Sequence, residues 1–172
     1  MLSDEQKSYL ATAVKPMQIV LVALALGVIV FLVAVVVLTD KPAEDPFLTY
    51  VGLAFGVIAF LAWLIVPNAL ASNARRTIAA GQNPSWAQGV SQQAAGDVGQ
   101  LAGVYQIRLI VASALLEGAA FFNLVAYLIE AHQLSLVAAV VLVVIMLCQF
   151  PTYNRLADWV SHELENVDQL RA

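Results

Sequence analysis

Four apolar stretches dominate the chain, at about 18–38, 47–66, 105–129 and 134–150. About 20 apolar residues in a helix cover the roughly 30 Å hydrocarbon core of a bilayer. An isolated strand would leave its backbone polar groups unpaired in lipid, so helices are expected even where β-branched residues are frequent. The sequence therefore predicts an all-α fold, an integral membrane four-helix antiparallel bundle with cytoplasmic helical extensions.

Composition supports a membrane protein and excludes other classes. Hydrophobic residues make up 61% of the 172-residue chain and charged residues 12%, whereas soluble domains average roughly 45–50% and 25%. The net charge of -4, without a clustered basic surface, argues against nucleic-acid binding. The single cysteine, Cys148, rules out an intrachain disulfide, and no Cys/His spacing predicts zinc. We expect one membrane domain without a cofactor.

The sequence also lacks the pattern of a catalytic site. His132 follows the third stretch and His162 lies in the tail, far from each other along the chain. No nucleophile motif or phosphate-binding loop accompanies them. We therefore expect no catalytic activity of the chain's own.

The N-terminal residues 1–17 are predicted to form a short helix at the membrane surface, ahead of the first span. Ser3 and Gln6 have the spacing of a capping box, in which each side chain bonds the backbone N–H of the other residue. The acidic residues here, and the length of the first apolar stretch, argue against a cleaved signal peptide.

Two polar segments connect the spans. Residues 39–46 form a short acidic loop with two prolines, and residues 67–104 form a longer cytoplasmic segment. In the longer segment one helix is expected to end at Gly81, and another to begin with Asn83 as its N-cap. The remainder is either a helical hairpin or a loosely ordered loop, and the third helix is expected to start near Gly99.

The tail, residues 152–172, has the spacing of an amphipathic helix. Its apolar positions alternate three and four residues apart, at Tyr153, Leu156, Val160, Val167 and Leu170. Glu163 occupies a position where this pattern predicts another apolar residue. We expect a surface helix that packs on its own protein.

The positive residues predict the orientation. If the four spans alternate in direction, one side of the membrane carries Lys7, Lys15, Arg75, Arg76, Arg108, Arg155 and Arg171, and the other carries Lys41. Positive residues favour the cytoplasmic side. We expect a multi-pass protein of the cell's inner (plasma) membrane with both termini in the cytoplasm.

Glu117 is the candidate functional residue. Arg108 and Glu130 mark the ends of the third stretch, so Glu117 lies close to the bilayer centre, where ionisable residues are rare and costly. The nearest cation along the helix, Arg108, is nine residues away, or about 13 Å. Ser113, one turn earlier on the same face, is the well-placed polar neighbour. We expect a neutral acid that bonds Ser113 or a backbone carbonyl, and an ion-binding site formed by these two residues.

Small residues predict close helix packing. Ala114 and Gly118 form a small-xxx-small pair beside Glu117, and Gly52 and Gly56 form a GxxxG pair in the second stretch. Such pairs let two helix backbones approach closely in a membrane. We expect self-association, because a small bundle cannot cover both pairs.

The run Ala114-Leu-Leu-Glu-Gly-Ala-Ala-Phe-Phe-Asn-Leu-Val125 resembles the carboxylate helix of the rotor-ring proteolipid (c) subunits of rotary ATP synthases. In that family an Ala-Leu-x-Glu run is followed by small residues, an aromatic position and a Leu-Val pair. The resemblance covers the third stretch alone. It implies that Glu117 carries an ion in a ring of identical protomers.

Two functions follow as hypotheses. In the first, an oligomeric, rotor-ring-like membrane protein uses Glu117 to handle protons or cations. In the second, a structural membrane subunit or scaffold uses Glu117 as a buried hydrogen-bonding group, and its cytoplasmic elements dock a protein partner. The expected partners are the lipid bilayer, further copies of the chain and a cytoplasmic or membrane protein.

The predicted topology is testable by cysteine labelling in intact cells. An impermeant thiol reagent should label cysteines introduced at 40–46 and 130–133, and should miss those at 68–104. Labelling of the long segment from outside would contradict the orientation.

Overall fold

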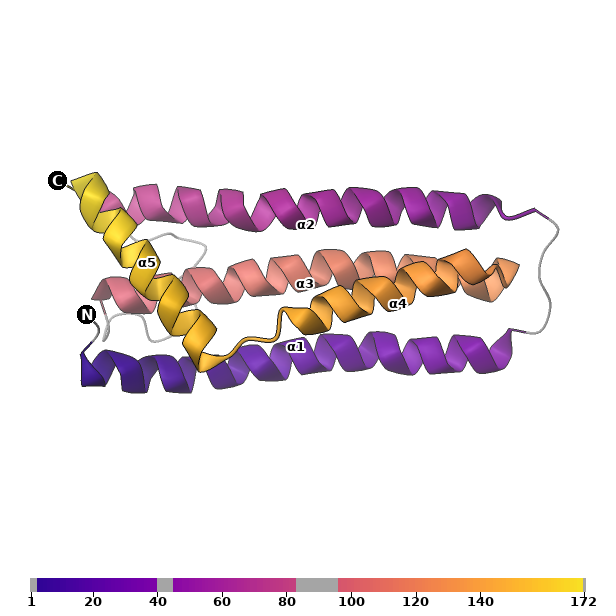
Figure 1. Ribbon diagram of the computed structural model, residues 1–172, viewed down its shortest axis with the longest axis horizontal. Helices are drawn as coiled ribbons and strands as arrows, with labels where there is room; N and C mark the ends of the chain where they lie inside the picture. The colour runs from indigo at the N-terminus through magenta and orange to yellow at the C-terminus, as the bar shows by residue number, and fades with distance from the viewer. Residues whose placement is uncertain (1–2, 40–44, 83–95, 172) are drawn as a thin grey trace. The chain divides into compact units, whose positions relative to one another are not determined.

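The computed structural model describes residues 3–39, 45–82 and 96–171, and all regular structure in these ranges is helical (Figure 1). The elements are α1 (Asp4–Leu38), α2 (Phe47–Ala79), α3 (Gly96–Glu130), α4 (Gln133–Cys148) and α5 (Tyr153–Arg171). The all-α part of the prediction is confirmed. The loop residues 40–44, the predicted helix start at Asn83 and the segment up to 95 lie outside the described residues.

Three of the described helices, α1, α2 and α3, are long and apolar enough to cross a membrane. The fourth predicted span corresponds to α4, which has 16 residues and reaches the necessary length only if α4 and α5 count as one broken span. These helices indicate a membrane protein.

Local signals at the helix ends agree with the sequence. Ser3 and Gln6 form the predicted capping box, with N···O distances of 2.9 and 3.3 Å. Gly81 ends α2 with a positive φ of 72°, and Gln82 N–H bonds back to Thr77 O at 3.0 Å. A left-handed residue after the last turn is a common helix ending, and glycine adopts it without strain.

The separation of residues 1–17 from the first span is wrong, because α1 runs through Pro16 as one helix of 35 residues. Proline removes one backbone hydrogen bond and strains the preceding turn. The buried positions nevertheless keep a spacing of three and four residues on both sides of it, at Leu10, Val14, Met17, Leu21, Ala25 and Val28. Continuous burial of one face maintains the helix. Similarly, α2 continues through Pro67 to Ala79, beyond the predicted span.

The chain divides into two compact units. The apolar unit comprises Val20–Ile65 and Val111–Phe150, and the polar unit comprises Met1–Ile19, Val66–Ile110 and Pro151–Ala172. Each of α1, α2 and α3 therefore contributes one part to each unit.

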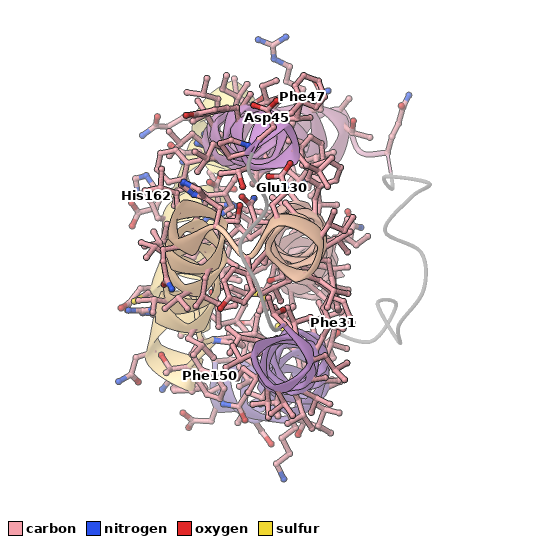
Figure 2. All side chains as sticks on the ribbon, turned by 90° about the vertical axis from the view of Figure 1, so that its right-hand side faces the viewer. Phe31, Asp45, Phe47, Glu130, Phe150 and His162 are labelled. Atoms are coloured by element: carbon pink, nitrogen blue, oxygen red, sulfur yellow. The ribbon has the colours of Figure 1, made fainter. Side chains whose placement is uncertain are left out.

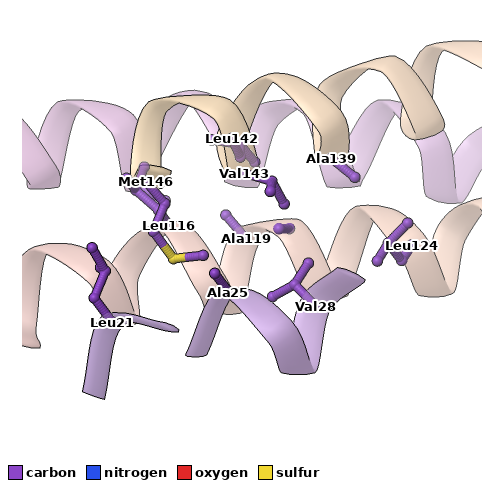
Figure 3. Close-up of a cluster of buried hydrophobic side chains, with 12 residues drawn as sticks. Leu21, Ala25, Val28, Leu116, Ala119, Leu124, Ala139, Leu142, Val143 and Met146 are labelled. Atoms are coloured by element: carbon purple, nitrogen blue, oxygen red, sulfur yellow. The ribbon is translucent and has the colours of Figure 1, made fainter. Parts of the chain in front are cut away.

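The core of the apolar unit contains small and branched side chains from α1, α2, α3 and α4 (Figure 3). Its buried residues include Leu21, Ala25, Val28, Ala59, Leu116, Ala119, Leu124, Ala139, Leu142, Val143 and Met146. Two aromatic pairs flank it, Phe31 with Phe121 at 5.3 Å and Phe55 with Phe122 at 5.4 Å between ring centres. These pairs place α1 and α2 on different sides of α3.

The core of the polar unit explains the interrupted pattern of the tail. Four residues of α5 are buried at a spacing of three and four, Leu156, Val160, Glu163 and Val167. Glu163 therefore lies on the core face, where its carboxylate is 3.1 Å from Arg75 Nε of α2. Leu170, predicted on the same stripe, is exposed.

The Arg75–Glu163 pair predicts an asymmetric response to mutation. The Glu163 side chain is 7% exposed and that of Arg75 is 31% exposed. Arg75→Met should therefore leave a buried, unpaired carboxylate and destabilise the fold by about 3 kcal/mol. Glu163→Met leaves an arginine that can reach water, so the loss should stay below about 1 kcal/mol. Thermal unfolding of both variants in detergent measures the difference, and equal losses would contradict the asymmetry.

Candidate functional site

Glu117 lies at the partly exposed edge of α3 in the apolar unit. Within the described residues its carboxyl group makes no hydrogen bond or ion pair. Four residues later on the same helix, Phe121 packs on Phe31 of α1. Glu117 therefore lies about one turn before a contact between α3 and α1, with its own side chain partly exposed.

The structure does not join Glu117 to Ser113. Ser113 is 1% exposed, and its Oγ has no hydrogen-bond partner among the described residues. Four residues of an α-helix advance by slightly more than one turn, about 40° further round the axis. That rotation separates a serine that faces the core from a glutamate at the surface. The predicted bond between Glu117 and Ser113 fails because of this angle.

The two pairs of small residues have different surroundings. Ala114 and Gly118 are exposed, and a Cβ atom added at Gly118 would meet nothing within 4 Å. A Cβ atom at Gly52 would instead lie 3.0 Å from Asn123 Oδ1. The pair Gly52 and Gly56 thus packs α2 on α3 inside one chain, whereas the pair beside Glu117 faces outward.

Asn123 forms the polar contact between α2 and α3. Its side-chain amide is fully buried, and Nδ2 donates to Gly52 O at 3.0 Å and to Ala119 O at 2.9 Å. The close approach at Gly52 makes this bond possible, since a larger residue there would displace the amide. Sequence analysis gave Asn123 no role, although an amide in an apolar span opposite a glycine is a recognisable signal.

Glu130 is a second carboxylate that sequence analysis treated only as the end of a span. It is buried, and it accepts hydrogen bonds from the backbone N–H groups of Leu48 and Thr49, the latter at 2.7 Å. Figure 2 shows Glu130 directed toward the start of α2, which Phe47 marks. The last residue of α3 therefore caps the first turn of α2.

The local sequence explains why α2 needs this cap. Tyr50 N–H bonds to Pro46 O, so Pro46 occupies the N-cap position. Proline has no side-chain acceptor for the free N–H groups of the first turn, which Ser, Thr, Asp or Asn would bond. The carboxylate supplies the acceptors, and its charge is favourable at the positive end of the helix dipole.

A pair of hydroxyl groups extends this site to α4. Ser135, in the first turn of α4, and Thr49 are fully buried, and their Oγ atoms are 2.8 Å apart. We call Leu48, Thr49, Glu130 and Ser135 the Glu130 cluster. It joins the starts of α2 and α4 to the end of α3.

Removal of the Glu130 carboxylate should destabilise the protein. Glu130→Ala leaves two backbone N–H groups of α2 without acceptors, and one unsatisfied buried group costs about 1–3 kcal/mol. We expect a loss of about 2–4 kcal/mol in thermal unfolding in detergent. Asp45→Ala is the matched control, because Asp45 is an exposed acid beside the same helix start. If Asp45→Ala lowers the stability as much as Glu130→Ala does, then negative charge near the start of α2 stabilises the helix, and the hydrogen bonds of the cap do not.

Searches of protein-family models, curated proteins and solved structures give no match to this chain. Within the described ranges, no group of three or more His, Cys, Asp or Glu side chains is arranged to hold a metal ion. The two glutamates of α3 have different surroundings: Glu130 is bonded on both carboxylate oxygens, and Glu117 has no partner among the described residues.

Proposed function

We propose that the chain is an oligomeric membrane protein in which Glu117 takes up and releases a proton or a cation near the middle of the bilayer. The observation that carries this proposal is the contrast within α3. Glu130 is buried and bonded to two backbone N–H groups, whereas Glu117 is partly exposed and without a partner in the described residues. A carboxyl group used only for structure would be expected to be bonded, as Glu130 is.

The topology in this proposal has four antiparallel spans, formed by α1, α2, α3 and α4, with both termini in the cytoplasm. Under this topology the polar unit is cytoplasmic, and Glu130 lies toward the opposite side. Glu117 lies 13 residues before Glu130, about 20 Å along the helix axis. That distance puts Glu117 well inside the hydrocarbon core, where a charge is costly and a neutral acid is favoured.

The chemistry requires two environments for one carboxyl group. Against lipid or an apolar neighbour, Glu117 holds its proton, because an unpaired charge has no compensating cation there. At a position that water, a cation or an arginine of another subunit reaches, it ionises. The outward pair Ala114 and Gly118 leaves room for such a neighbour, since a Cβ atom at Gly118 would meet nothing within 4 Å.

Self-association supplies the second environment in this proposal. The pair Gly52 and Gly56 is already occupied by α3 of the same chain. The pair Ala114 and Gly118 has no such partner within the described residues, and small pairs of this kind mediate helix contacts in membranes. A ring of copies, as the resemblance of this helix implies, would bring Glu117 to each subunit boundary.

A structural scaffold is the competing function. The Asn123 bond and the Glu130 cluster favour it, because they are buried polar contacts that fix the helices of the apolar unit. In a scaffold Glu117 would bond across a contact between subunits and would never release its proton. The two functions therefore predict different effects of Glu117→Gln, which replaces the carboxyl group by an amide that cannot release a proton.

Substitution of Glu117 and carbodiimide labelling separate the two functions. Carbodiimides modify protonated carboxyl groups in apolar surroundings, so peptide mapping should find Glu117 modified in the wild-type protein and Glu130 unmodified. Sodium ions should slow the reaction if Glu117 binds a cation, and should not change it if Glu117 binds only protons. Glu117→Gln should keep the oligomer and abolish proton- or cation-coupled transport in proteoliposomes.

Under the scaffold function, Glu117→Gln should be silent and Glu117→Leu should weaken the oligomer by roughly 1 kcal/mol, the loss of one interhelical hydrogen bond. An unreactive Glu117, together with an infrared signal of an ionised carboxylate at pH 7, would refute ion handling. A monomer in mild detergent and in native membranes would refute the assembly.

A further inference from the structure

A basic and aromatic cluster lies in the polar unit where the apolar part of α3 begins. Arg108 of α3 donates from Nη2 to Asn68 Oδ1 of α2 at 3.2 Å. Its guanidinium carbon lies 5.8 Å from the centre of the Trp159 ring of α5. Tyr105, one turn earlier on α3, packs on the same tryptophan at 5.3 Å between ring centres. Three helices thus hold one guanidinium group in place.

The charge of Arg108 is oriented by these contacts and is not neutralised by them. Within the described ranges, Arg75 pairs with Glu163 and Arg171 pairs with Asp97, whereas Arg108 contacts an amide and an aromatic ring. A guanidinium has five N–H donors in a fixed fork. One N–H bond to Asn68 leaves further donors for an anion.

A second cation increases the positive potential at this place. Arg155 lies four residues before Trp159 on α5, so the two side chains share a helix face. Arg155 and Asn68 are exposed, and Arg108, Tyr105 and Trp159 are partly exposed, so a ligand can approach. The cluster therefore combines two positive charges, two aromatic rings and an open side.

The position on α3 indicates the kind of anion. From Leu109 to Leu116 the helix carries no charged residue, and Trp, Tyr and Arg at the end of such a stretch are typical of the membrane–water boundary. The anions most abundant at that boundary are the phosphates of lipid headgroups, which cationic pockets between helices bind. The arginine fork matches phosphate oxygens in a bidentate arrangement.

We propose that Arg108, Asn68, Tyr105, Trp159 and Arg155 form a binding site for the phosphate of an anionic lipid headgroup. The guanidinium of Arg108 bonds two phosphate oxygens, and Trp159 and Asn68 hold it in the required orientation. Arg155 adds charge, which favours an anionic lipid over a zwitterionic one. The site requires that α3 spans a membrane and does not depend on the function of Glu117.

The test uses the full-length protein in a nonionic detergent and three probes, short-chain phosphatidylglycerol, short-chain phosphatidylcholine and inorganic phosphate. Native mass spectrometry counts the bound probe, and thermal unfolding without any probe reports the fold of each variant. Phosphatidylglycerol should bind saturably and more tightly than phosphatidylcholine. Arg108→Gln should weaken its binding roughly tenfold, as expected for the loss of a charge-assisted hydrogen bond.

Arg76→Gln is the matched control, because Arg76 is an exposed arginine that belongs to the same unit and lies outside the cluster. It removes the same charge and should leave phosphatidylglycerol binding within about twofold of wild type. Arg108→Lys keeps the positive charge, so it provides a folded variant if Arg108→Gln does not fold. It should bind phosphatidylglycerol with an affinity between those of the wild type and Arg108→Gln, because lysine lacks the guanidinium fork.

Three outcomes would overturn the proposal. One is equal phosphatidylglycerol binding by the wild type and a folded Arg108 variant. Another is an equal loss of phosphatidylglycerol binding in Arg76→Gln, which would indicate that the lipid is attracted by the net positive charge and not by a specific site. The third is binding of inorganic phosphate as tight as that of phosphatidylglycerol, which would identify a soluble phosphate as the ligand.

Discussion

The capping of α2 by Glu130 is the contact on which the arrangement of the apolar unit depends. A helix bonds its own backbone groups everywhere except in its first and last turns, and in apolar surroundings no water replaces the missing partners. The start of α2 follows a proline that has no acceptor to offer. A carboxylate from the end of α3 accepts from the N–H groups of Leu48 and Thr49, and the Ser135 hydroxyl bonds that of Thr49. The Glu130 cluster thereby joins three helix ends.

The same helix contains two glutamates with opposite surroundings. The carboxylate of Glu130 is an anion among donors, held by hydrogen bonds and by the dipole of another helix. Glu117 is partly exposed, and the described residues leave open space beside the adjacent Gly118. A charge is stabilised at the first position, and it is costly at the second if Glu117 lies in the hydrocarbon core, as we propose. The difference in environment, and not the residue type, assigns a structural role to one and a proton- or cation-carrying role to the other in our proposal.

Periodicity and end signals in the sequence were sufficient to predict the helical fold, the capping box at Ser3 and a helix end at Gly81, although not that this helix continues the second span. The sequence failed where a distant part of the chain compensates for a local defect. A separate helix was predicted for residues 1–17 and a span for 47–66, but α1 runs through Pro16 and α2 through Pro67, because continuous burial of one face maintains both helices. Glu163 breaks the apolar pattern of the tail in the sequence. In the structure it pairs with Arg75, which lies 88 residues earlier in the chain.

The candidate site was predictable only in part, for the same reason. The rarity of an acid in an apolar stretch identifies Glu117 from the sequence alone. Helical spacing also associates it with Ser113, but the direction of the core decides which of the two is buried. The role of Glu130 depends on Leu48 and Thr49, which are more than 80 positions away along the chain. No local pattern contains that information.

The absence of proline from α3 has a mechanical consequence. Both α1 and α2 contain a proline close to the boundary between the two units, whereas α3 passes from Gly96 to Glu130 with none. A regular α-helix is stiff against twisting about its axis, because hydrogen bonds join each turn to the next. A rotation of α3 about its axis at Glu117 would therefore turn the backbone at Arg108, about 13 Å away along the axis, by nearly the same angle.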